Sequence, residues 1–303
     1  MKYSGIGGQA VIEGIMMMKG EDYAVAVRRP DKEIEVKKDT YQSITKKAKI
    51  LQLPFVRGVF RFADSMIIGM RSLTYSASFF EDDEDAEPGK FEQFLDRVFG
   101  EKLESAIMAA VLVISFILAI GIFMLLPLGI ANLFKGVITS DHLMAVLEGV
   151  IRIAIFIIYI KLVSRMEDIR RTFMYHGAEH KCINCVEHGH PLTVKYVRES
   201  SKEHKRCGTS FILIVMVISI LMFMVIRVDT IWMRILSRII LVPVIAGISY
   251  EVLQCAGRSN SKFMDLVSRP GMWMQGLTTK EPDDSMIEVA IAATEAVFDW
   301  REY

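Results

Sequence analysis

The residues best suited to chemistry lie in one short stretch near the middle of the chain. The motif His176-Gly-Ala-Glu179-His180 places two histidines four residues apart, so on a helix both imidazoles would lie on one face and could bind one metal ion. Glu179 would project close by and could act as a general base in catalysis or as a ligand. Downstream, His204 and Cys207 supply another imidazole and a thiol at helical spacing. Because such donors suit zinc or iron better than magnesium, we expect a divalent transition metal as cofactor.

The same residues also allow an interpretation without a metal. Histidines beside a membrane, among many lysines and arginines, can hydrogen-bond lipid headgroups or cap helices. The C-x-x-C pair of Cys182 and Cys185 could add thiolate ligands, could be redox-active or could be incidental. Glu251 follows His180 by seventy-one residues, near the spacing of a third ligand in some inverted zincins. A helix of about 20 residues is about 30 Å long, so Glu251 could reach the membrane boundary where the histidines would lie.

Four apolar segments must position these residues, and they predict a membrane protein. Residues 105–134 and 207–226 contain thirty and twenty consecutive uncharged residues, and roughly 20 suffice for a transmembrane helix. Residues 143–163 and 231–254 are weaker, but each completes a helical hairpin with a strong neighbour. Glu148 and Arg152 stand four residues apart and could pair on one helical face. We expect four spans, with three as the alternative.

The distribution of charge sets the expected orientation. The chain has 36 basic and 36 acidic residues and 52% hydrophobic residues, which excludes a disordered chain and a basic nucleic-acid binder. Residues 161–206 hold ten lysines and arginines, whereas the connections 135–142 and 227–231 hold one each. The positive-inside rule therefore predicts a multi-pass protein of the cell membrane with both termini in the cytoplasm. The first residues lack an apolar stretch, so no cleaved signal peptide is expected.

The N-terminal stretch GGQAVIEGIMMM contains a lone carboxylate, Glu13, among apolar neighbours. If it is buried, it needs a partner, which would be a cation from the basic central segment or a metal ion. The alternative is a tight turn before a methionine-rich segment that contacts the membrane.

Further along, a β-hairpin is predicted over 23–28 and 33–37, and residues 42–80 are predicted to be helical.

The expected fold is mainly α, a polytopic helical membrane protein with a small α+β cytoplasmic N-terminal region and a cytoplasmic central loop. Residues 81–87 form an acidic linker, residues 91–104 an amphipathic interfacial helix, and the residues after Pro282 a docking helix. The predicted regions are an N-terminal region at 1–90, an interfacial helix and first hairpin at 91–163, a loop bearing His and Cys at 164–206, a second hairpin at 207–254, and a C-terminal tail at 255–303.

Five motifs, in this order, make the chain similar to a known family: GGQAVIEGIMM, YHGAEHKCINCVEHG, HKRCGTSF, GISYEVLQ and RPGMWMQGLTTKEPDD. They resemble the DUF1385 family of bacterial membrane proteins over nearly the whole chain. The resemblance implies a metal-dependent enzyme. It also implies a partner, because some members are known as the membrane protein partner of the ornate large extremophilic RNA, a long noncoding RNA.

The resemblance points to particular residues of this sequence. Two departures stand beside them: Cys182 occupies a position where threonine is more usual, and Met18-Lys19 stands where an arginine commonly follows the methionines. The C-x-x-C pair is therefore not expected to be a shared site. The residues implied are Gln9, Glu13, His176, Glu179, His180, His204, Cys207 and Glu251.

Three functions are compatible with these features. The first is a membrane metalloenzyme, hydrolase-like, with His176, His180, His204 or Cys207 as ligands and Glu179 as base. The second is a scaffold that binds a structured noncoding RNA or a protein partner at the inner leaflet, supported by ten basic against six acidic residues in 161–206. The third is a transporter, which would use the charges within the spans and would need several chains to assemble as a homo-oligomer. The charges concerned are Glu148, Arg152, Arg238 and Glu251.

Overall fold

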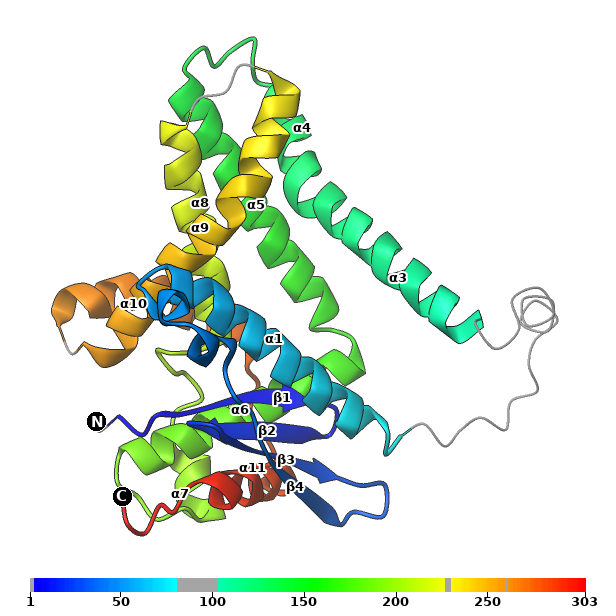
Figure 1. Ribbon diagram of the computed structural model, residues 1–303, viewed down its shortest axis with the longest axis vertical. Helices are drawn as coiled ribbons and strands as arrows, with labels where there is room; N and C mark the ends of the chain where they lie inside the picture. Colours follow the sequence, from blue (N-terminus) through cyan, green and yellow to red (C-terminus); the bar gives the residue numbers. More distant parts are fainter. Residues whose placement is uncertain (1–2, 81–102, 227–229, 260) are drawn as a thin grey trace. The chain divides into compact units, whose positions relative to one another are not determined.

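The computed structural model describes residues 3–80, 103–226, 230–259 and 261–303, and it is mainly helical with one small antiparallel sheet (Figure 1). The chain divides into two compact units, residues 1–80 with 160–303 and residues 81–159. The predicted linker 81–87 and nearly all of the predicted interfacial helix 91–104 lie outside the described residues.

The sheet belongs to the first unit and has the order β1-β2-β3-β4, a meander of neighbouring antiparallel strands. The hairpin predicted over 23–28 and 33–37 is confirmed as β3 and β4. The first two strands are not expected from the sequence. The alternative in which the methionine-rich segment contacts a membrane is wrong, because Met16 and Met17 are buried in β2. The strands are β1 (Ile6–Val11), β2 (Gly14–Lys19), β3 (Asp22–Arg28) and β4 (Ile34–Thr40).

Strand β2 is covered on both faces, which explains why its residues 15–18 are apolar rather than alternating. On one face, Ile15 and Met17 pack against helices α6 and α11. On the other, Met16 packs near Ile68 of helix α1. A strand buried on both faces gives a continuous apolar run, which periodicity cannot distinguish from other buried segments. The helices are α1 (Val56–Ala77), α6 (Glu167–Glu187), α7 (Val194–Glu199) and α11 (Asp284–Val297).

The predicted helical region 42–80 and the predicted docking helix are both present. Residues 44–52 form two short 3₁₀ helices (Ile44–Lys47 and Lys49–Gln52) before α1 begins. The docking helix is α11, whose first turn is capped by Asp283 and whose apolar face enters the core of the sheet. The predicted central loop is largely helical, because α6 occupies half of it.

Parts of the predicted regions 1–90, 164–206 and 255–303 belong to one compact unit.

Four helices are long and apolar enough to cross a membrane, at 113–132, 141–163, 208–225 and 239–257, in agreement with the four predicted spans. In the second unit, Arg152 donates to Glu148 at 2.7 Å, the predicted pairing along one helical face. The elements concerned are α3 (Leu103–Ile120), a π-helical turn (Gly121–Leu125), α4 (Leu126–Asn132), α5 (Asp141–Val163), α8 (Gly208–Val225) and α9 (Ile231–Arg258). Helix α10 (Lys262–Thr278) follows α9 and packs against α8 and α9.

Candidate metal centre

Helix α6 brings two of the predicted ligands together, and the segment before α8 adds a third. His176 and His180 lie one turn apart on α6, with ring centroids separated by 4.4 Å. One ligand atom from each of His176, His180 and Cys207 lies within 4.8 Å of the other two. Cys207 and His180 are buried, and His176 is half-buried. The spacing of the H-x-x-E-H motif thus places both imidazoles on one helical face, as predicted.

Both histidines are oriented by backbone carbonyl groups. The Nδ1 of His176 lies 3.0 Å from the Thr278 carbonyl oxygen, and the Nδ1 of His180 lies 2.7 Å from the Lys202 carbonyl oxygen. Because a carbonyl only accepts, each Nδ1 carries a proton, so in the neutral form of each ring the Nε2 presents its lone pair. Histidines that ligate metals are commonly held in this way by a partner of the other ring nitrogen.

The third donor stands at the start of α8. The Sγ of Cys207 lies 3.2 Å from the Nε2 of His176 and accepts a hydrogen bond from the Thr209 N–H at the helix N-terminus. The N-terminal end of a helix favours negative charge, which suits a ligating thiolate. Around a tetrahedral zinc ion, nitrogen and sulfur ligands lie about 3.3–3.6 Å apart. The ligand atoms, which lie within 4.8 Å of one another, would therefore bind one zinc-sized ion after the more distant of them approach by about 1 Å.

The close packing around α6 depends on a glycine between the two histidines. A Cβ atom on Gly177 would overlap the carbonyl oxygen of Lys280, which passes directly over the helix. In the same crossing, the Lys280 N–H donates to the Phe173 carbonyl at 2.9 Å. The end of α10 and the residues that follow it thus lie against α6, and Thr278, the last residue of α10, supplies the carbonyl that orients His176.

Side chains of α6 also hold the segment that leads to Cys207. Lys181 donates to the carbonyls of Arg198 and Ser200, both at 2.8 Å. Asn184 donates to those of Ser201 and Glu203, at 2.7 and 2.9 Å. Together with the bond from His180, these contacts satisfy nearly every carbonyl between residues 198 and 203. They fix the path of the chain toward the third donor.

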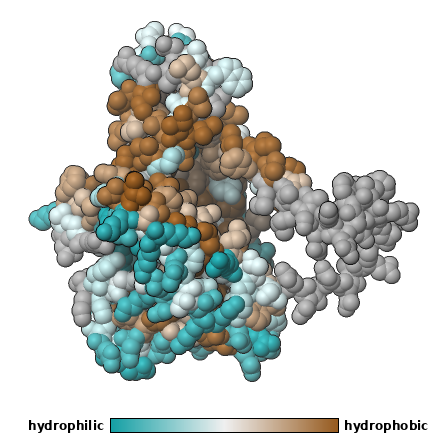
Figure 2. Space-filling model, in the orientation of Figure 1, coloured by the Kyte–Doolittle hydropathy of each residue, from teal (hydrophilic) through white to brown (hydrophobic). Residues whose placement is uncertain are grey.

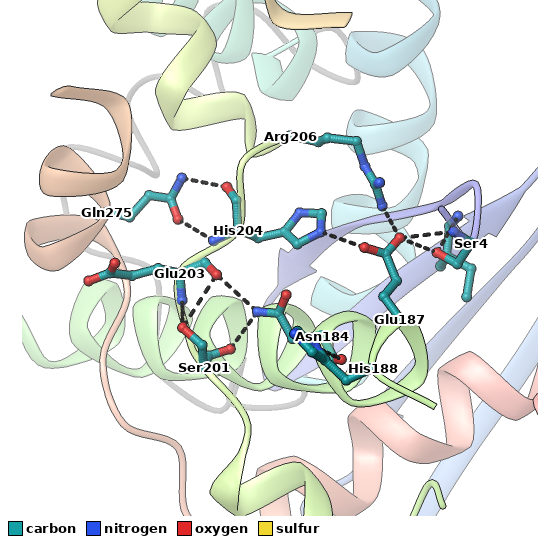
Figure 3. A network of polar contacts seen from close by, with 10 residues as sticks. Ser4, Asn184, Glu187, His188, Ser201, Glu203, His204, Arg206 and Gln275 are labelled. Carbon is teal, nitrogen blue, oxygen red and sulfur yellow. Dashed lines mark hydrogen bonds and ion pairs between the residues drawn. The ribbon is translucent and has the colours of Figure 1, made fainter. Parts of the chain in front are cut away.

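His204 lies next to the cluster but faces another partner (Figure 3). Its ring centroid is 5.8 Å from that of His180, while its Nε2 lies 3.4 Å from the Glu187 carboxylate. Its backbone N–H and carbonyl both bond the Gln275 amide, each at 2.8 Å. Burial lowers the pKa of His204. The structure thus places His204 beside the three clustered donors, bound to Glu187.

Glu187 is a buried carboxylate with several hydrogen-bond donors around it. It accepts hydrogen bonds from the N–H and hydroxyl of Ser4, at 3.0 and 2.7 Å, and from Arg206. Burial alone would raise the pKa of Glu187, but the hydrogen bonds from His204, Arg206 and Ser4 outweigh it and lower the pKa to about 2. Glu187 therefore ties the N-terminal segment, α6 and the segment before α8 together (Figure 3).

Glu179, the predicted base, points to the edge of the sheet. Its buried carboxylate accepts a hydrogen bond from the Gly8 N–H of strand β1, and a Cβ on Gly8 would lie 2.9 Å from the Glu179 Cγ. Burial raises the pKa of Glu179 to about 7, against the opposing effects of His176 and Gly8. The paired glycines of the N-terminal motif thus allow the strand to approach this carboxylate closely.

The remaining candidates lie away from the three clustered donors. Glu13, in the β1–β2 turn with a φ of 48°, accepts two hydrogen bonds from Arg171 at 2.5 and 2.6 Å. A cation from the central segment, one of the partners expected for Glu13, is therefore present. Glu251 is held by Arg57, at 2.7 and 2.5 Å. Gln9 packs against Gly69 of α1.

The two cysteines of the C-x-x-C pair are part of the hydrophobic core. Cys182 and Cys185 are fully buried on α6, and burial raises the pKa of both thiols. The Sγ of Cys185 lies 3.5 Å from the Pro191 carbonyl oxygen. This environment disfavours a reactive thiolate.

We therefore expect Cys182→Ala to have the same metal content as the wild type. The substitution removes a buried sulfur from the core but none of the three clustered donors. Zinc and iron content per chain, measured on the purified variant, checks this, with Cys207→Ala as the matched control that should lose metal. A loss of metal in Cys182→Ala equal to that in the control would show that the C-x-x-C pair is part of the site.

Sequence reasoning misses the residues that support the donors. Neither Glu187 nor Gln275 stands at a ligand spacing, although both lie within motifs that carry the family resemblance. The carbonyl groups of Thr278 and Lys202 cannot be recognised in the sequence, because every residue has a backbone carbonyl. Only the path of the chain identifies them.

The comparisons with known proteins agree with the resemblance. The family model described as protein of unknown function DUF1385 matches residues 53–300. The chain belongs to the DUF1385 family. An uncharacterised protein of Bacillus subtilis, YqhQ, is 34% identical over 286 residues, which cover 94% of this chain and 89% of the relative. No solved structure matches the chain. Family membership extends over the apolar helices and the His/His/Cys cluster alike.

Proposed function

We propose that this DUF1385 protein is a membrane-embedded metalloprotein that binds one divalent transition metal ion, zinc or iron. The ligands are the Nε2 atoms of His176 and His180 and the Sγ of Cys207. The observation that carries the proposal is the convergence of these atoms within 4.8 Å, with both Nδ1 atoms already bonded to carbonyl groups. Three protein ligands with a fourth position left open are typical of catalytic rather than structural zinc sites.

The proposed activity is that of a metal-dependent, hydrolase-like enzyme. When bound, zinc supplies Lewis-acid chemistry. In this proposal Glu179 serves as general base, since its carboxylate is close enough to His176 for their charges to interact. His204 lies outside the ligand set and positions the segment before Cys207, through Glu187 and Gln275. The ligand role predicted for His204 is not needed for a three-ligand site.

We place the centre at the cytoplasmic face of the cell membrane. Cys207 immediately precedes α8, one of the four candidate spans, so the ligands lie at the end of that helix. The excess of basic residues in 161–206 supports this side of the membrane through the positive-inside rule. Under this proposal, both termini lie in the cytoplasm.

The basic residues of 161–206 give less support to an RNA scaffold. Six of the ten are paired with carboxylates, which reduces the positive charge available to phosphates. The pairs are Arg171–Glu13, Lys181–Glu281, Arg198–Asp284, Lys202–Glu281, Lys205–Asp265 and Arg206–Glu187. Binding of a structured RNA thus stays a prediction from the resemblance.

Metal content tests the proposal. Protein purified without chelators should hold about one zinc or iron ion per chain, as expected for a site with three protein ligands. His176→Ala and His180→Ala should each lose it, because two remaining donors bind a metal weakly. His188→Ala is the matched control, since His188 lies on the same segment but bonds the Asn184 carbonyl at 2.7 Å. Metal-free wild-type protein, or equal metal in all three variants, would contradict the proposal.

A further inference from the structure

Helix α1 has its apolar and polar faces reversed relative to a helix of a soluble protein. The residues it buries are mostly small or polar: Gly58, Asp64, Ile68, Gly69, Ser72 and Ser76. The residues it exposes include Phe62, Met66, Met70 and Leu73, which repeat at helical spacing, with exposed fractions of 45%, 56%, 57% and 40%. A surface helix ordinarily turns its apolar stripe to the core. The outward stripe of α1 therefore needs a covering that the described chain does not supply.

Helix α10 shows the same reversal. It buries Ser268, Gly271, Met274, Gln275 and Thr278, and Gln275 is bonded to Ser210 of α8 at 2.9 Å. It exposes Phe263, Leu266 and Trp273, with exposed fractions of 68%, 58% and 60%. Pro270 is exposed on the same stripe. Two helices far apart in the sequence thus share one unusual pattern.

Both helices adjoin the candidate spans α8 and α9. The ring of Phe62 on α1 lies 5.5 Å from that of Phe211 on α8. Gly58 of α1 packs so closely on α9 that an added Cβ would lie 2.7 Å from the Tyr250 Cβ. Gly271 of α10 packs on Ser210 in the same way. In Figure 2, brown hydrophobic surface covers the spans of this unit, and teal hydrophilic surface covers the sheet and the helices beside it.

The composition of the outward stripes matches the lipid–water interface. Aromatic and aliphatic side chains are accompanied by exposed cations, Arg61 on α1 and Lys262 and Arg269 on α10. Tryptophan is enriched where a protein meets lipid headgroups, and basic side chains beside it interact with anionic lipids. A lipid bilayer contacts the spans and the neighbouring helices together, so it requires the apolar stripes of α1 and α10 to adjoin the apolar surface of α8 and α9. A second protein chain would set no such requirement.

We propose that α1 and α10 are interfacial helices that lie in the headgroup layer of the bilayer, with the stripes Phe62/Met66/Met70/Leu73 and Phe263/Leu266/Trp273 inserted among the lipids. The proposal rests on the membrane location proposed for α8 and α9 but not on the metal. It also gives α10 two faces with different tasks. Its outer face contacts lipid, while Gln275 and Thr278 on its inner side hold His204 and His176.

Tryptophan fluorescence in nanodiscs tests the proposal. The full chain has three tryptophans, Trp232, Trp273 and Trp300. The double variant W232F/W300F reports Trp273 alone, and W232F/W273F reports Trp300, which bonds Glu295 on the sheet side of the unit. Nanodiscs of phosphatidylcholine and phosphatidylglycerol would carry bromine at different depths along the acyl chains. Iodide would quench from the water.

Trp273 should lose most of its emission to bromine near the glycerol end of the acyl chains, because the apolar face of an interfacial helix inserts about 5–10 Å into the boundary between headgroups and acyl chains. Deeper bromine should quench Trp273 less, and Trp300 should respond only to iodide. A tryptophan at Val242, which is exposed on α9 within a candidate span, would report the span in a background without the other tryptophans.

Two outcomes would overturn the proposal. If Trp273 is quenched by iodide but by bromine at no depth, its face is open to water. If neither quencher reaches it, a second copy of the chain or another protein covers it. In either case, quenching of Val242→Trp by deep bromine would show that the assignment of α9 as a membrane span still holds. If deep bromine does not quench Val242→Trp, the span assignment has failed as well. If W232F/W300F folds poorly, the single variant W273F replaces it. The part of the wild-type emission that bromine near the glycerol end quenches should then be missing from W273F.

Discussion

Replacing Gly177 with alanine is expected to destabilise the protein by about 3 kcal/mol or more and to abolish metal binding. The added Cβ would overlap the Lys280 carbonyl oxygen, which is backbone and cannot turn away like a flexible side chain. The segment after α10 would have to leave α6. The bond from Lys280 to Phe173 and the Thr278 carbonyl that orients His176 would then be lost together. Thermal unfolding in detergent and metal content per chain measure the two effects.

Gly276→Ala is the matched control for this substitution. Gly276 lies in α10, and a Cβ there would meet nothing within 4 Å. An alanine at an open helical position stabilises by about 0.5–1 kcal/mol. If Gly177→Ala unfolds at the temperature of the control and keeps its metal, the described crossing of Lys280 over α6 is wrong.

Replacing Glu187 with glutamine should cost about 3 kcal/mol at neutral pH. The pKa of Glu187 falls from 4.5 to about 2 in the folded protein, and a tenfold change in proton affinity corresponds to about 1.4 kcal/mol. The glutamine keeps the size of the side chain but removes the charge that Arg206 and His204 face. Breaking a buried pair on one side leaves the other charge without compensation.

The effect of Glu187→Gln should depend on pH in a defined direction. Because the folded pKa is lowered, the stabilising contribution of Glu187 is complete above about pH 4.5 and is lost as the pH falls toward 2. Unfolding curves of wild type and variant should therefore differ at pH 7 and converge near pH 2. Glu199→Gln, at an exposed position of the same unit, should change stability by less than about 0.5 kcal/mol. A difference that persists unchanged at low pH would contradict the assigned charge of Glu187.

Much of the architecture could be predicted from hydrophobic runs and spacing. The four candidate spans follow from length and apolarity alone, and the pairing of Glu148 with Arg152 follows from their i, i+4 spacing. Strands β1 and β2 could not be predicted, because methionine is not a typical strand residue and β2 is buried on both faces. The folding of residues 1–80 with 160–303 into one unit depends on contacts distant in sequence, such as Ser4 with Glu187.

The candidate site could be predicted in part, and the reason lies in local geometry. His176 and His180 share a helix, so their spacing determines that they share a face. Cys207 joins them only because α6 and Gln275 hold the preceding segment, which no local pattern encodes. Glu251 has the spacing of a distant ligand, but Arg57 binds it instead. At this site, the separation between two residues in sequence therefore predicts the contact within helix α6 but not the contacts with residues of other segments.

X-ray absorption at the metal edge of the purified protein tests the central claim most directly. For zinc held by His176, His180 and Cys207, the first shell should contain one sulfur at about 2.3 Å and nitrogen or oxygen neighbours at about 2.0 Å. The sulfur contribution should disappear in Cys207→Ser and persist in Cys185→Ser. A first shell without sulfur in the wild type, or one with sulfur that survives Cys207→Ser, would contradict the proposed centre.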